Sequence, residues 1–144
     1  MPTESHLLDL NVLVALAWPQ HVHHGRAHAW FAARRGEWMT TPVTESGFVR
    51  LSTNPSVVSE RISMADALAL LAAMRAVPGH QFLPDASTLA QPAVSLAAVA
   101  TTRQVTDAHL VNLAASSGVR LATFDRGIEQ MLAAGDRRHV LVLP

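Results

Sequence analysis

The chain has 144 residues, of which 49% are hydrophobic, so it is long and apolar enough for a globular domain with a real core. It contains no cysteine, which excludes disulfides, thiolate metal sites and cysteine nucleophiles, and leaves nitrogen and oxygen as the metal-binding atoms. The formal net charge is zero, and all eleven basic residues are arginine, which excludes any step that needs a lysine amine. No apolar run has the length of a signal sequence or a membrane span, and we therefore expect a cytoplasmic protein.

Short apolar runs alternate with longer helical patterns along the chain, which predicts a single α/β domain over residues 1–144 with a mostly parallel central β-sheet flanked by α-helices. Thr41 and Pro42 form a good N-cap and first-turn pair, and Ser63 and Thr106 are further candidate caps. Residues 85–105 predict a short helix and a loop. The predicted strands are residues 6–9, 38–40, 80–84, 120–124 and 139–143, and the predicted helices are residues 10–17, 21–35, 42–54, 63–77, 106–117 and 126–134.

Four carboxylates stand where an apolar run gives way to the start of a helix. Asp9 and Asp125 directly follow predicted strands, Glu45 lies in the first turns of the helix after the second strand, and Asp107 opens its own helix. In open α/β sheets, ligands bind beyond the carboxyl ends of the strands. We therefore expect all four acids to converge on that edge of the sheet.

Each acid also has a purely structural interpretation. Asp125 would serve as a helix N-cap, and Asp107 in a first turn would favour the helix dipole, effects worth about 1 kcal/mol or less each. Asp107 nevertheless shares a helix face with Leu110 and Val111, so it points along a buried stripe. For Asp9 a structural role is the least expected, because a buried ionised carboxylate must be paired or coordinated.

Clustered carboxylates repel one another unless a cation neutralises them. Mg²⁺ or Mn²⁺ meets that need, since these ions take oxygen ligands and can also hold phosphate oxygens. One or two such ions activate a water for in-line displacement at phosphorus, so the implied chemistry is phosphodiester hydrolysis. With the four acids set aside as ligands, eleven arginines against seven other acids leave a charge of +4, which is compatible with a nucleic-acid substrate.

Four segments, LLDLNVLVAL, TTPVTESGFVRL, VTDAHLVNLA and LATFDRGIE, resemble the four acidic motifs of PIN-domain nucleases. Their order and the chain length are similar to those of the VapC toxins of toxin–antitoxin modules, and the resemblance covers essentially the whole chain. It implies a PIN-like fold, a Mg²⁺- or Mn²⁺-dependent endoribonuclease acting on RNA, a small VapB-like antitoxin partner and a homodimer.

The resemblance also assigns roles to individual residues. Leu10 departs from the small or hydroxyl residue often found after the first acid of the family. Arg50 and Arg126 lie near two of the acids, where either ion pairing or contact with RNA phosphates would explain them. The implied catalytic and metal-binding acids are Asp9, Glu45, Asp107 and Asp125, with Asn11 and Thr123 as polar supporting residues of the first and fourth motifs.

Two further patterns concern the surface. His24 and His28 are an i, i+4 pair that could hold zinc, but no Glu follows His24, the HExxH pattern is absent, and a solvated polar face is favoured. Met64 and Leu68 belong to an apolar stripe of the helix over residues 63–77. That stripe predicts either packing on the sheet or docking of an antitoxin segment or a second protomer.

Alternatives from other classes are a non-catalytic acidic-pocket binding module, such as a phospho-receiver domain, and a phosphatase of the haloacid dehalogenase type. Both of the named folds rely on a lysine near the acids, and this chain has none. The phosphatase also requires a second acid two residues after the first, where this sequence has Asn11.

Overall fold

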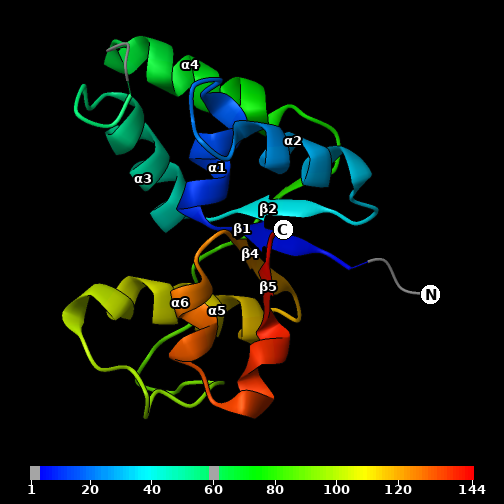
Figure 1. Ribbon diagram of the computed structural model, residues 1–144, viewed down its shortest axis with the longest axis vertical. Helices are drawn as coiled ribbons and strands as arrows, with labels where there is room; N and C mark the ends of the chain where they lie inside the picture. The colour runs from blue at the N-terminus through cyan, green and yellow to red at the C-terminus, as the bar shows by residue number, and fades with distance from the viewer. Residues whose placement is uncertain (1–3, 59–61) are drawn as a thin grey trace.

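The computed structural model describes residues 4–58 and 62–144. Five strands form one sheet in the order β3-β2-β1-β4-β5, and all four neighbouring pairs are parallel. The predicted α/β fold with a central parallel sheet is therefore confirmed (Figure 1). The strands are β1 His6–Leu8, β2 Trp38–Thr40, β3 His80–Phe82, β4 Arg120–Thr123 and β5 Val140–Val142.

The helices form two layers, with α1 to α4 on one face of the sheet and α5 and α6 on the other (Figure 1). Leu7 belongs to the apolar core of the α5 side, whereas Leu8 belongs to the core of the α1 side, because successive strand residues point to opposite faces. A parallel sheet covered on both faces therefore buries both leucines completely. The helices are α1 Leu10–Ala17, α2 His24–Ala33, α3 Pro42–Ser52, α4 Met64–Arg75, α5 Val105–Ser116 and α6 Arg126–Gln130, with 3-10 turns η1 Thr102–Gln104 and η2 Ala134–His139.

The strand order gives the sheet a switch point between β1 and β4. From the central β1 the chain moves outward through β2 and β3, and then returns to the other side of β1 with β4 and β5. The crossovers leave the carboxyl ends of β1 and β4 side by side, and Asp9 N–H donates to the carbonyl of Ala122 at 2.9 Å across this boundary. This is the place where open α/β sheets bind ligands.

Local signals explain where several helices begin. Thr41 and Thr44 form a capping box ahead of α3, with Pro42 in the first turn, and the Ser63 hydroxyl accepts from Asp66 N–H at 3.0 Å ahead of α4. The expected Thr106 cap is wrong, because α5 already begins at Val105. The turn η1 runs directly into α5 and supplies its start.

Two other helix predictions differ from the structure. The short helix expected within residues 85–105 is reduced to η1, and residues 83–101 run without helix, tied down by contacts such as Ala93 N–H to the Asn112 side chain at 2.7 Å. Helix α6 ends at Gln130 rather than near Ala134, because the chain turns there to bury Met131 and Leu132 in the core.

The paired histidines of α2 serve α1. His24 Nδ1 lies 2.7 Å from the carbonyl of Ala15, and His28 Nε2 lies 2.8 Å from the carbonyl of Leu16. These carbonyls belong to the last turn of α1, where backbone carbonyl groups have no hydrogen-bond donor within their own helix. The pair therefore caps α1, as a structural alternative to zinc binding.

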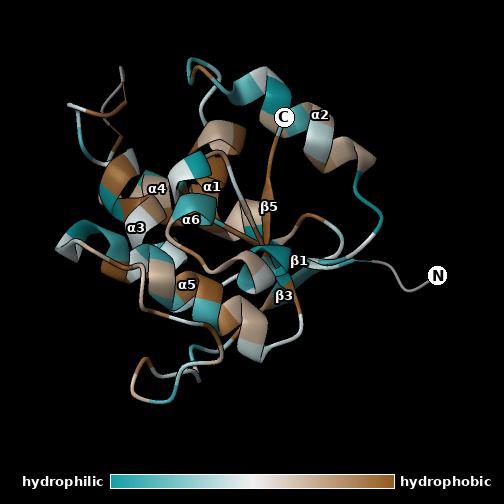
Figure 2. Cartoon of the chain, turned by 60° about the horizontal axis from the view of Figure 1, so that its bottom comes forward, coloured by the Kyte–Doolittle hydropathy of each residue, from teal (hydrophilic) through white to brown (hydrophobic). Residues whose placement is uncertain are grey.

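Figure 2 shows hydrophilic residues at the start of α2 and a strongly hydrophobic β5.

Candidate active site

Asp9 follows β1 and is the N-cap of α1, with only 6% of its surface exposed. Its Oδ1 accepts from Leu10 N–H at 2.7 Å, and its Oδ2 accepts from the Thr123 hydroxyl at 2.7 Å. Burial raises the pKa of Asp9 above its ordinary value, the two hydrogen bonds oppose this, and the charge of Asp125 adds to the rise. Both oxygens of Asp9 are therefore held in place, and ionising this carboxyl with no cation beside it costs free energy.

Thr123, the last residue of β4, connects the first and fourth motifs through one fully buried hydroxyl. Besides donating to Asp9, that hydroxyl accepts from the Asn11 amide at 3.2 Å and from Asp125 N–H at 3.0 Å. The Asn11 carbonyl oxygen in turn accepts from Phe124 N–H at 3.3 Å. The structure thus places both predicted supporting residues in contact with the acids or with the backbone beside them.

Asp107 and Asp125 complete a group of three aspartates within electrostatic range of one another. Asp107 is partly buried in the first turn of α5, and burial together with the charges of Asp9 and Asp125 raises its pKa to about 6. Asp125 is exposed and caps α6, where its Oδ1 accepts from Gly127 N–H at 2.8 Å. Asp125 therefore acts as a cap and also adds negative charge to the site.

Glu45 has a different set of partners. The Thr40 hydroxyl donates to Glu45 Oε2 at 2.6 Å, and Arg75 Nη1 of α4 lies 3.6 Å from Oε1. The Glu45 side chain is only 14% exposed, and the charges that perturb Asp9 and Asp107 come from aspartates. The structure thus places three of the four predicted acids within electrostatic range of one another, whereas the fourth, Glu45, contacts Thr40 of β2 and Arg75 of α4. Sequence reasoning missed Thr40 and Arg75; the polar end of β2 gave a signal for Thr40, but nothing local pointed to Arg75.

Two arginines flank the aspartates. Arg50 is exposed on α3 and lines a cleft of about 510 Å³ with Val43, Gly47 and Thr106, the residue before Asp107. Arg126, the first residue of α6, is also exposed. Within residues 4–58 and 62–144, neither arginine forms an ion pair with an acid. Both guanidinium groups are therefore available to a phosphate, which favours that interpretation over structural pairing.

The chemistry of these donors fits a hard divalent cation. Three carboxylates lie near one edge of the sheet, and the pKa of Asp107 is raised first by burial and then by the charges of Asp9 and Asp125, a repulsion that a cation would relieve. In the part of the chain that the structure describes, no three His, Asp or Glu side chains are already grouped closely enough to hold an ion. Mg²⁺ commonly uses only one or two direct carboxylates and keeps several waters, so such a preformed group is not required.

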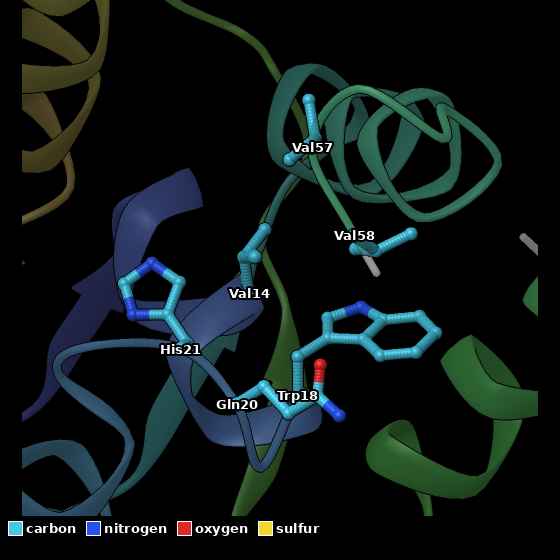
Figure 3. A pocket seen from close by; sticks show the side chains of 6 residues that line it. All are labelled: Val14, Trp18, Gln20, His21, Val57 and Val58. Carbon is cyan, nitrogen blue, oxygen red and sulfur yellow. The ribbon is translucent and has the colours of Figure 1, made fainter. Parts of the chain in front are cut away.

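A separate hollow of about 450 Å³ lies between the turn after α1 and the segment after α3. Its lining is mainly apolar, and Figure 3 shows the rings of His21 and Trp18 at its borders. The Trp18 indole N–H donates to the Ser52 hydroxyl at 3.1 Å, which fixes one wall. Among the described residues, no carboxylate lines this hollow, and its lining shares no residue with the aspartate site. The described lining residues are Val14, Trp18, Gln20, His21, Val57 and Val58.

Comparisons with known proteins agree with this geometry. The family model described as PIN domain matches residues 6–132. Ribonuclease VapC38 of Mycobacterium tuberculosis is 54% identical over 123 residues, which cover 85% of this chain and 86% of that protein. Ribonuclease VapC39 of the same organism is 47% identical over 131 residues, covering 90% and 94%.

A solved structure shows the same fold. The crystal structure of Mycobacterium tuberculosis VapC20, described as a sarcin–ricin loop cleaving toxin, superposes with a TM-score of 0.58 over 86% of this chain and 92% of that chain, at 14% identity. Across the described residues, no helix is long and apolar enough to cross a membrane. The family model and the curated relatives together show that this chain belongs to the PIN domain family, among its VapC ribonucleases.

Proposed function

We propose that this protein is a Mg²⁺- or Mn²⁺-dependent endoribonuclease, the toxin of a toxin–antitoxin module, which hydrolyses phosphodiester bonds of RNA with a metal-activated water. One observation carries the proposal: Asp9, Asp107 and Asp125 lie within electrostatic range of one another near the switch point of the sheet, where neighbouring carboxylate charge adds to the burial that raises the pKa of Asp9 and of Asp107. The relatives that bear the name Ribonuclease VapC support the reaction class.

The three aspartates are the residues that would hold the ion. A bound Mg²⁺ or Mn²⁺ would supply an activated water and stabilise the leaving oxygen of an in-line displacement. Thr123 and Leu10 fix both oxygens of Asp9, so this ligand loses little freedom on binding. Asp107 must give up its proton to bind a cation, so competence should rise with pH through about 6.

The flanking residues have supporting roles in the proposal. Arg50 and Arg126 contact phosphates on the two sides of the cleaved bond, as charge-assisted hydrogen bonds from guanidinium groups allow. Glu45 joins the ligands only when Thr40 and Arg75 release it, since both of its oxygens face those partners. The resting site is therefore a site of three aspartates.

We further propose that a VapB-like antitoxin docks on the groove between α3 and α4. The groove measures about 830 Å³ and is lined by apolar residues that include Leu68 and Phe82, which are 51% and 42% exposed. Leu71 and Met74 of the same stripe pack against the core, so packing accounts for only part of it. Contiguous exposed apolar surface favours a partner. The homodimer suggested by the family resemblance remains a prediction.

Cleavage assays on purified protein test the function. With Mn²⁺ or Mg²⁺ the protein should cut RNA internally, and sequencing the new 5′ ends would give the sites. EDTA or the change Asp9→Asn should abolish cleavage, whereas Asp66→Asn on the exposed first turn of α4 should leave it unchanged. Acetyl phosphate labelling of Asp9 without RNA cleavage would instead support a phospho-receiver and contradict the proposal.

A further inference from the structure

An aromatic and cationic group adjoins the aspartate site. Phe124 stands between Thr123 and Asp125, and the ring of His23 stacks on it with centroids 4.6 Å apart and planes inclined by 24°. The guanidinium carbon of Arg26 lies 5.0 Å from the centre of the same ring. Arg26 also contacts the His23 imidazole directly. Two residues at the start of α2 are thus laid over the loop that carries the fourth acid.

Helix capping does not explain this arrangement. His23 occupies the N-cap position of α2 but makes no side-chain capping hydrogen bond, in contrast to His24 and His28, which bind carbonyls of α1. The His23 side chain is only partly buried, and Arg26 is exposed. The ring of His21 lies 5.6 Å from that of His23 and borders the hollow of Figure 3, so a further aromatic ring lies next to His23.

We propose that the His23 ring, supported by Phe124, is a subsite on which an unpaired base of the RNA next to the cleaved bond stacks, with Arg26 contacting the adjoining phosphate. This inference rests on the proposed ribonuclease function. Single-stranded RNA is commonly recognised by stacking of splayed bases on aromatic side chains and on arginine planes. Because Phe124 directly precedes Asp125, a base on this platform lies beside the chain segment that carries the acids.

The electrostatics divide the roles of the two α2 residues. Burial and the neighbouring charge of Arg26 lower the pKa of His23, so its imidazole is neutral at pH 7 and presents an uncharged aromatic face. The Arg26 guanidinium has no carboxylate partner within the described ranges. In the proposed subsite the base therefore stacks on His23, and the phosphate contacts Arg26.

Three variants separate stacking from other effects. His23→Leu removes the ring but keeps an apolar side chain, His23→Phe keeps a ring without nitrogen atoms, and Val22→Ala changes an 83% exposed neighbour in the same turn. Because His23 provides no cap, all three variants should keep the fold, and circular dichroism would check this. The probes are fluorescein-labelled octamers of adenosine, with and without an abasic nucleotide at each position in turn, titrated in Ca²⁺ by fluorescence anisotropy.

We expect His23→Leu to weaken binding of the adenosine octamer by roughly 5- to 100-fold, the range of stacking one base on an aromatic ring. His23→Phe and Val22→Ala should bind within about 2-fold of wild type, as an intact ring predicts. At one position, the abasic nucleotide should itself weaken wild-type binding and remove the effect of His23→Leu. A 2-aminopurine placed at that position should lose fluorescence on wild type and on His23→Phe, but not on His23→Leu.

Four results would overturn the subsite. If His23→Phe loses as much affinity as His23→Leu, or if no abasic position removes the effect of His23→Leu, no base stacks on this ring. If wild type cleaves RNA while His23→Leu binds the octamer normally, the subsite fails and the ribonuclease function stands. If wild type neither binds nor cleaves any RNA, the proposed function fails and the subsite falls with it.

Discussion

Replacing Asp107 by Asn should stabilise the metal-free protein, although it should abolish cleavage. In the folded state the pKa of Asp107 is raised from 3.8 to about 6, mainly by burial and then by the charges of Asp9 and Asp125. A carboxyl whose pKa is higher in the folded than in the unfolded state lowers the free energy of unfolding when it is ionised, and has no such effect when it is protonated in both states. Its destabilising effect is therefore absent below pH 4, grows as pH rises, and is complete above about pH 6.

The size of the effect follows from the shift. About two pKa units correspond to about 3 kcal/mol, which we reduce to about 1–2 kcal/mol because Asp107 is only partly buried and solvent screens its neighbours. The Asn side chain has nearly the same shape, and within the described residues no donor contacts the Asp107 carboxylate, so no hydrogen bond is lost. The melting temperature of the variant should rise by several degrees at neutral pH.

Urea unfolding in EDTA at pH 4.5 and pH 7.5 measures the effect. The free energy of unfolding of Asp107→Asn should exceed that of wild type by about 1–2 kcal/mol at pH 7.5, and by only about a third of that gain at pH 4.5, where Asp107 is protonated in the folded state. Asp66→Asn, on the exposed first turn of α4, should change the free energy of unfolding little at either pH. Equal or lower stability of Asp107→Asn at pH 7.5 would refute the repulsion that underlies the metal site, and a gain of the same size at both pH values would show that ionisation is not its cause.

Three further predictions follow from the same geometry. Thr123→Val should lower stability by about 2–4 kcal/mol in denaturant unfolding, because it leaves the three polar groups on that buried hydroxyl without their partner, and wild-type stability would contradict the network. Arg75→Gln removes one of the two contacts that hold Glu45 and should tighten Mn²⁺ binding several-fold in calorimetry, whereas Arg35→Gln in the exposed segment just after α2 should not; weaker binding would show instead that Arg75 holds Glu45 in place for the metal. Affinity for Mn²⁺ should rise with pH through about 6 in wild type as Asp107 loses its proton, and a pH-independent affinity would exclude Asp107 as a ligand.

The sequence predicted what local chemistry decides. The apolar runs identified the five strands to within two residues, and Pro42 and Ser63 marked the starts of α3 and α4. The edge of the sheet near which the aspartates lie followed from the rule that ligands bind beyond the carboxyl ends of parallel strands, since Asp9 directly follows β1 and Asp125 comes two residues after the end of β4.

What the sequence left open depends on contacts between distant segments. Glu45 is held by Thr40 and by Arg75, which lies thirty residues away on another helix, and no periodicity encodes the pairing of Glu45 with Arg75. The i, i+4 spacing of His24 and His28 is compatible with a zinc pair, but in the folded chain both rings contact backbone carbonyls at the end of α1. The stacking of His23 on Phe124 joins residues about a hundred positions apart, so only the folded chain shows it.

The most direct test of the account follows Mn²⁺ binding and RNA cleavage in the same titration, with the ion monitored by electron paramagnetic resonance. Cleavage and Mn²⁺ occupancy should rise along one saturation curve in wild type, and both should be lost together in Asp9→Asn. Cleavage that persists in EDTA, or an Asp9→Asn variant that cleaves at the wild-type rate, would contradict the claim that these aspartates form a metal-dependent ribonuclease site.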